Sequence, residues 1–235
     1  MKSPNMQWKL GPVAMTLLLT ASSWGAAAKT EPPPTAGERA ALTKEGELAK
    51  NPELYLQFIR GIQQQHLYHA AIAHLDAFAL RWPDNDQAML LRAHATRELG
   101  RSDKARELYR ALVGGDFSAE AYHGLGIVEM KAGRIEEAMD ALNHAAALAP
   151  INVDVLSDQG EALMAAGRLE EAKQSLLRAA ELDDRSKSVG ANLARLQILE
   201  GKPQQAEETM RRFGIAPPMQ QEIRQKATET VKKTP

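Results

Sequence analysis

The sequence has no cysteine, few aromatic residues and almost no net charge. Without cysteine, the chain cannot form a disulfide framework, a thiolate metal centre or a lipid-carrying cysteine anchor. Aromatic side chains make up 5% of the 235 residues, and the formal net charge is −1. So balanced a charge gives no reason to expect a nucleic-acid partner.

Sequence motifs for catalysis are also missing. The chain has no Gly-x-Ser-x-Gly elbow, no His-Glu-x-x-His pair, no phosphate-binding loop and no glycine-rich dinucleotide turn. The acidic pairs Glu136-Glu137 and Glu170-Glu171 each follow a glycine turn, where carboxylates favour the start of a helix through its dipole. We therefore expect a protein that is not an enzyme and that has no cofactor.

A group of histidines raises the question of a metal site. His66 and His69 are three residues apart and would share one face of a helix. His74 is five residues beyond His69 and points elsewhere, so a third ligand is missing. We predict no metal site, and an enzyme or metal-binding protein built on His66 and His69 is the alternative with the least support.

The one long apolar run lies at the N-terminus and spans residues 10–24. It is shorter than the ~20 residues that a transmembrane helix needs, and Gly11 and Pro12 interrupt it. The small residues 25–28 follow it and offer a cleavage site. Residues 1–28 are therefore predicted to be a secretory signal peptide, with an uncleaved anchor as the alternative. Cleavage would leave a periplasmic protein with no integral membrane span, which could associate with the outer membrane through its partners.

A repeat of about 34 residues organises the rest of the chain. An alanine recurs at intervals of 34, 33, 34 and 34 residues, at Ala71, Ala105, Ala138, Ala172 and Ala206. Five residues before it, four of the units have a glycine, at Gly100, Gly133, Gly167 and Gly201, whereas the first unit has His66. Such a period predicts stacked supersecondary units, because one unit cannot bury its apolar face alone.

The third unit shows the pattern most completely. It contains Tyr122, then Leu125-Gly126, the turn glycine Gly133 and the alanine Ala138, and it closes at Pro150. This order resembles the tetratricopeptide repeat (TPR), in which an aromatic residue, Leu-Gly, Ala and a closing Pro mark two antiparallel helices. The fifth unit has Gly190 at the aromatic position, as a terminal, capping repeat tolerates.

The resemblance implies an all-α fold, a right-handed superhelical solenoid of about five TPR helix-turn-helix repeats. A proline-rich linker and an N-terminal capping helix are expected to precede the repeats, and a C-terminal helix or tail, packed or mobile, to follow them. The expected segments are 29–50 for the linker and cap, 51–213 for the TPR domain with repeats at about 52–85, 86–118, 119–152, 153–186 and 187–213, and 214–235 for the tail.

The first helices of TPR units form a concave inner face, and the resemblance implies where this chain presents it. A helix buries one stripe within its pair, so a second apolar stripe indicates a groove for an amphipathic helix or extended peptide, with arginines for carboxylates. The alternative is that tight superhelical curvature covers part of this stripe. The expected groove residues are Leu56, Arg60, Leu90, His94, Arg97, His123, Ile127, Met130, Glu161, Met164, Arg195 and Ile198.

The end of the chain carries a second resemblance. Asn192-Leu-Ala-Arg-Leu and Gly201-Lys202 in the last unit precede a helix and a Pro217-Pro218 break, an order similar to that of TadD, the TPR protein of Flp/Tad pilus assembly. The resemblance implies a scaffold that binds secretin or pilus-assembly components. The alternative role is an accessory of polysaccharide export or cell-wall enzyme complexes.

Overall fold

A computed structural model of the chain describes residues 50–233. This part folds into eleven α-helices and has no strand, as the sequence predicts. The signal peptide, the proline-rich linker and most of the N-terminal cap expected from the sequence lie outside the described residues. The helices are α2 (Pro52–Gln64), α3 (Tyr68–Ala79), α4 (Asp86–Glu98), α5 (Ser102–Leu112), α6 (Ser118–Lys131), α7 (Ile135–Leu148), α8 (Val153–Ala165), α9 (Leu169–Leu182), α10 (Lys187–Leu199), α11 (Pro203–Arg212) and α12 (Pro217–Lys233).

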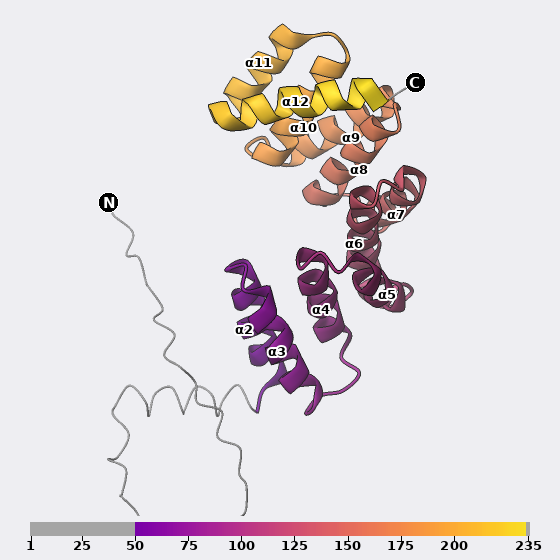
Figure 1. Cartoon of the computed structure of the whole chain (residues 1–235), viewed down its shortest axis with the longest axis vertical. Coiled ribbons are helices and arrows are strands. Elements are labelled where there is room, and N and C mark those ends of the chain that lie inside the picture. The colour runs from indigo at the N-terminus through magenta and orange to yellow at the C-terminus, as the bar shows by residue number, and fades with distance from the viewer. Residues whose placement is uncertain (1–49, 234–235) are drawn as a thin grey trace, which may run out of the picture. The chain divides into compact units, whose positions relative to one another are not determined.

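The helices pack as five consecutive pairs, and α12 follows the last pair (Figure 1). Each second helix packs on its own first helix and on the first helix of the next pair. The first helices α2, α4, α6, α8 and α10 also pack on one another in sequence. We call this row the inner layer and the second helices the outer layer, because the layer whose neighbours touch directly lies on the inside of the bend.

Side-chain caps fix where most inner helices begin. Asn51, Asn85 and Asn152 each accept a hydrogen bond from the backbone N–H three residues on, at 2.8–3.1 Å, and Ser186 does the same for α10 at 3.4 Å. The helix α6 starts differently, because its first residue Ser118 turns its hydroxyl back to the preceding loop instead. Four of the five inner helices thus share one type of start.

The turns inside the pairs use the left-handed backbone conformation. Gly100, Gly133, Gly167 and Gly201 have φ between 73° and 76°, a range in which a side chain is strained. In the first pair His66 occupies the equivalent position with φ of 60°. The irregular first turn of the sequence therefore keeps the backbone path of the other four.

Close contact between layers depends on small residues. The five repeated alanines lie between the layers and are fully buried. Gly126 leaves no room for a Cβ, which would stand 2.5 Å from Cγ of Leu142, and Gly160 meets Leu176 at the same distance. These glycines let an outer leucine pack directly on the inner backbone.

Gly190 corrects one expectation. A glycine at the aromatic position predicts that the last, capping unit lacks its aromatic anchor. In the structure the ring of Phe213, from the end of α11, fills the space that a Cβ on Gly190 would need. Phe213 is buried, so the last pair keeps an aromatic anchor that comes from the other helix.

The helix α12 packs on the inner helix α10 (Figure 1). Ile223 and Ala227 on its contacting side are buried. Within residues 50–233, no helix combines the length and the apolar character that crossing a bilayer requires.

Substituting Gly126 with Ala tests the close contact. We expect Gly126→Ala to lower the free energy of unfolding by about 1–3 kcal/mol, because the added methyl must displace Leu142. Gly61→Ala is the matched control, since this helical glycine has no atom within 4 Å of a new Cβ. It should raise stability by about 0.5–1 kcal/mol. Urea unfolding followed by circular dichroism measures both, and equal effects of the same sign would contradict the account.

Candidate protein-binding face

The 34-residue period arranges the inner layer into rows of equivalent positions. The central row comprises Arg60, His94, Ile127, Glu161 and Arg195, at intervals of 34, 33, 34 and 34 residues. One turn earlier in each helix lies the row of Leu56, Leu90, His123, Ser157 and Ala191, and about one turn later that of Gln63, Arg97, Met130, Met164 and Ile198. Every expected groove residue belongs to one of these rows.

The expected groove residues lie partly on the surface and partly in the core. Arg60 is exposed, and the half-buried members are His94, Arg97, His123, Ile127, Met130, Glu161 and Ile198. Leu56 and Met164 are 1% and 0% exposed and lie in the core clusters, so they cannot contact a partner. Including them was wrong, because neighbouring first helices cover the flanks of the stripe. Leu90 and Arg195 are nearly buried as well, at 7% and 6%.

Two separate hollows open on this layer. The first, which we call the N-terminal hollow, lies over α2, α4 and the start of α6 and has a volume of about 510 Å³. Leu90 and Phe117 contribute its apolar wall. Arg60 and Gln63 line it as well, and the Gln63 amide donates to the Leu91 carbonyl at 2.7 Å, which ties α2 to α4.

The second, the C-terminal hollow, lies between α8, α10 and α12 and has a volume of about 500 Å³. Its apolar wall comes from Ala191, Ile215, Met219 and Ile223, so α12 supplies much of it. This hollow could not be predicted from the sequence, because residues as far apart as Glu161 and Lys226 line it together.

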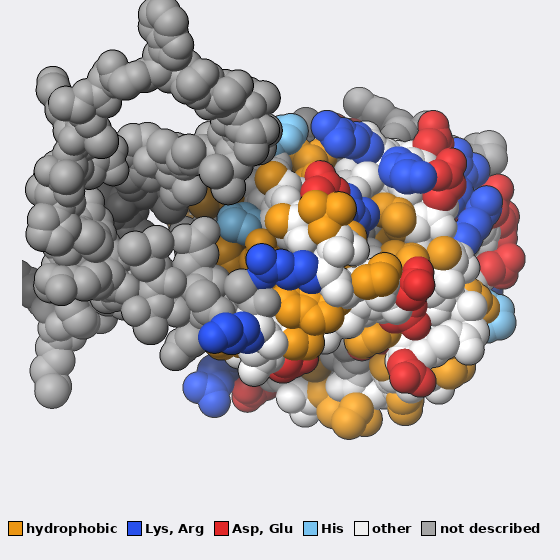
Figure 2. Space-filling view, turned by 90° about the horizontal axis from the view of Figure 1, so that it is seen from below, with side chains coloured by type: hydrophobic (Ala, Val, Ile, Leu, Met, Phe, Trp, Pro, Cys, Tyr) orange, Lys and Arg blue, Asp and Glu red, His pale blue; other side chains and the backbone are white. Residues whose placement is uncertain are grey.

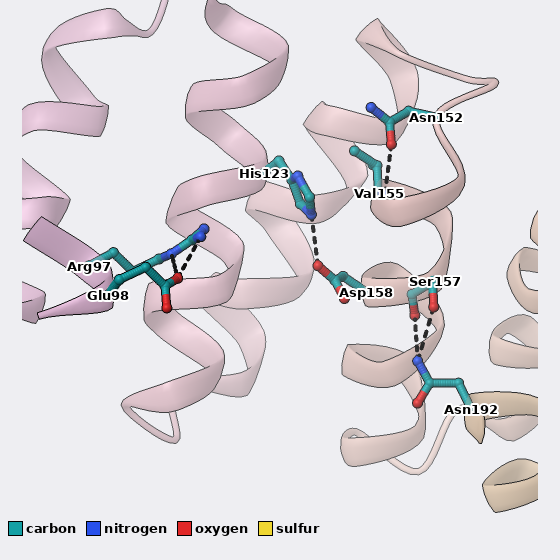
Figure 3. Close-up of polar contacts among 8 residues, drawn as sticks. All are labelled: Arg97, Glu98, His123, Asn152, Val155, Ser157, Asp158 and Asn192. Carbon is teal, nitrogen blue, oxygen red and sulfur yellow. Dashed lines mark hydrogen bonds and ion pairs between the residues drawn. The ribbon is translucent and has the colours of Figure 1, made fainter. Parts of the chain in front are cut away.

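Polar bridges join neighbouring inner helices (Figure 3). One of them involves Asn192, which lines the C-terminal hollow. Nε2 of His123 on α6 donates to Asp158 on α8 at 2.7 Å. At the next junction the equivalent pair is Asn192 on α10, which donates to the Ser157 hydroxyl at 3.0 Å. Sequence reasoning missed Asp158, although its spacing of 34 residues from Asn192 was available as a signal.

The junction between α4 and α6 has a different composition. The positions that form the bridge elsewhere are Leu90 and Gly124 here, and neither side chain can hydrogen-bond. The ring of Tyr109, from the outer layer, fills the space beside Gly124 and is fully buried. The junction is therefore held by an aromatic contact in place of a polar bridge.

His94 lies at this junction and is kept neutral. Burial is the main cause, and the positive charges of Arg97 and His123 add to it, so that the pKa of His94 falls from 6.5 to about 4. Its ring centroid lies 5.8 Å from that of Tyr109. At neutral pH His94 thus offers hydrogen bonds in the N-terminal hollow and no charge.

The histidines considered for a metal do not converge. His66 is in the first turn beside the Tyr68 hydroxyl, at 2.9 Å, and His74 packs against Tyr55. Across residues 50–233 no three His, Cys, Asp or Glu side chains are placed to hold a metal ion. His66, in the turn, and His69, on α3, are both exposed.

The charged side chains on one face of the molecule are mixed in sign (Figure 2). Figure 2 shows one face of the molecule, on which hydrophobic side chains lie between basic and acidic ones. This face has no continuous field of a single sign, so electrostatics there favours no highly charged polymer.

Paired helices stacked at a constant period, with a hollowed inner layer, define a helical-repeat protein of the kind that binds other proteins. Family models described as tetratricopeptide repeat match residues 62–122, 92–153, 129–191 and 188–212. The chain belongs to the tetratricopeptide-repeat family.

A relative by sequence is the TPR repeat-containing protein PA4299 of Pseudomonas aeruginosa, 30% identical over 119 residues. The match covers 50% of this chain and 46% of PA4299, so the chain spans about half the length of that relative.

Solved structures of several TPR proteins are similar in fold. PilW, a type IV pilus biogenesis factor, has a TM-score of 0.65 at 21% identity, over 78% of this chain and 87% of PilW. PilF of Pseudomonas aeruginosa has a TM-score of 0.62 at 21% identity, over 72% of this chain and 77% of PilF. MamA of Desulfovibrio magneticus RS-1 has a TM-score of 0.56 at 16% identity, over 78% of this chain and 96% of MamA. At these identities the likeness shows the fold alone.

The lowered pKa of His94 predicts an acid-sensitive stability. In the unfolded chain His94 takes up a proton as the pH falls through 6.5, whereas in the folded protein it does so only near pH 4. The free energy of unfolding therefore decreases as the pH falls from 6.5 to 4. The free energy of unfolding should fall between pH 7 and pH 4 in both the unmodified protein and the His94→Gln variant. Allowing for partial exposure of the ring, we expect the fall to be about 2 kcal/mol smaller in His94→Gln than in the unmodified protein. Urea unfolding at both pH values measures this, and parallel losses in the two proteins would refute it.

Proposed function

We propose that this chain is an exported, non-enzymatic scaffold whose inner layer binds segments of other proteins while a pilus or secretion machine of the envelope is assembled. The observation that carries the proposal is the pair of hollows on the inner layer, each of which combines an apolar wall with charged and hydrogen-bonding side chains. A TPR solenoid uses such a surface to hold peptides or helices.

The pilus context has weaker support of two kinds. PilW is a type IV pilus biogenesis factor with a similar fold, although a likeness at 21% identity carries no function with it. The end of the chain resembles the TadD proteins of Flp/Tad pilus assembly, and the N-terminal sequence is typical of a secretory signal. Secretin or pilus-assembly components are therefore the partners that we propose, and the periplasm is the proposed compartment.

A pull-down from envelope extract tests the role. We expect the unmodified protein to retain secretin or pilus components, and Arg60→Glu/Ile127→Glu to lose at least nine tenths of them, because both residues belong to the central row of the inner layer. Neither residue is buried, so the fold should survive, which circular dichroism checks.

Leu177→Glu is the matched control. Leu177 is 47% exposed on the outer helix α9, and its substitution adds one negative charge away from the hollows, as Ile127→Glu adds one on the inner layer. Equal retention by all three proteins would exclude the inner layer as the binding surface. Retention of envelope proteins unrelated to pili or secretion would exclude the assembly role and leave the surface in place.

A further inference from the structure

Arg195, which lines the C-terminal hollow, has a buried donor with no acceptor. Arg195 has only 8% of its side chain exposed, and its Nη1 donates to Glu161 at 2.8 Å. Its Nε is buried and has no hydrogen-bond partner. Leaving a buried polar group unsatisfied costs about 1–3 kcal/mol, so an acceptor supplied by a bound molecule would be favourable here.

The charges around the hollow favour an acidic ligand. The lining includes Lys187, Arg195 and Lys226 against Glu161 and Glu222. Glu161 accepts from Arg195, and Glu222 lies 2.9 Å from Lys226. Lys187 remains, exposed in the first turn of α10, where the helix dipole is also positive. The net effect attracts a carboxylate.

The apolar wall requires more than a lone anion. Ile215 and Ile223 are 5% and 4% exposed and form the rear of the hollow, whereas Met219 on α12 is 46% exposed at its edge. A methionine is an adaptable contact for an apolar side chain. The volume of about 500 Å³ is that of a small-ligand pocket, which suits a few side chains of a segment but not a whole helix.

We propose that the C-terminal hollow is a docking site for an acidic amphipathic segment of a protein partner. Lys187 attracts a carboxylate of that segment, and the guanidinium of Arg195 turns its unpaired Nε–H toward that carboxylate on binding. A neighbouring apolar side chain packs on Met219. This inference rests on the proposed function and names the chemistry of the partner that the inner layer selects.

Fluorescence anisotropy with labelled peptides tests the site. The probe is a 16-residue helical peptide with leucine at i, i+3, i+4 and i+7 and glutamate elsewhere, and its twin has lysine for every glutamate. We expect the acidic peptide to bind the purified protein and Lys187→Glu/Lys226→Glu to weaken its Kd at least tenfold, since both lysines are exposed and line the hollow. Arg195→Lys, which keeps the charge but lacks Nε–H, should weaken it severalfold. Lys104→Glu, on the outer helix α5 with 63% exposure, should leave it unchanged.

Three results would overturn the inference. They are equal binding of the lysine twin, an unchanged Kd in the double variant, or no binding by either peptide. A concentration-dependent dimer that only the double variant dissociates would assign the hollow to a second copy instead. Partner capture that still depends on Arg60 and Ile127 would show that the proposed function stands when this inference fails, because neither residue lines the C-terminal hollow.

Discussion

The structure depends on the closeness with which each outer helix approaches its inner partner. Glycines on the inner helices leave space for large outer side chains, as Gly126 does for Leu142 and Gly190 for Phe213. Alanines on the outer side complete the contact and are fully buried. Because dispersion attraction falls off steeply with distance, one added methyl at such a point separates the layers. The constant period of the stack follows from this contact.

Because the period is constant, a difference between two repeats in sequence changes the contact between the same two positions of neighbouring inner helices. Equivalent positions lie side by side, so the residue types at one position decide how two neighbouring inner helices are joined. His123 with Asp158 and Ser157 with Asn192 make polar bridges, whereas Leu90 with Gly124 cannot. The bridge from His123 lies between the hollow over α2, α4 and α6 and the hollow beside α12. The inner layer thereby offers two places of different chemistry.

The repeat itself could be predicted from the sequence. The spaced alanines and turn glycines indicated the helix pairs and the family, because each marks a backbone requirement that is local. Burial of Leu56 and Met164 could not be predicted, since it depends on how far each pair rotates against the next. The contact of Phe213 with Gly190 could not be predicted either, because the aromatic ring there comes from the end of α11 instead of from α10. The C-terminal hollow could be found only once the position of α12 was known, and the polar sequence of α12 does not predict that position.

Site-specific photocrosslinking in cells that make the protein naturally tests the central claim, that the inner layer is the binding surface. A photoreactive residue is placed at Arg60 or Ile127 on the inner helices, and at Leu80 or Leu177 on the outer side, where exposure is 88% and 47%. We predict crosslinks to envelope proteins from the inner positions alone. Crosslinks that come only from Leu80 and Leu177 would contradict the account and move the binding surface to the outer layer.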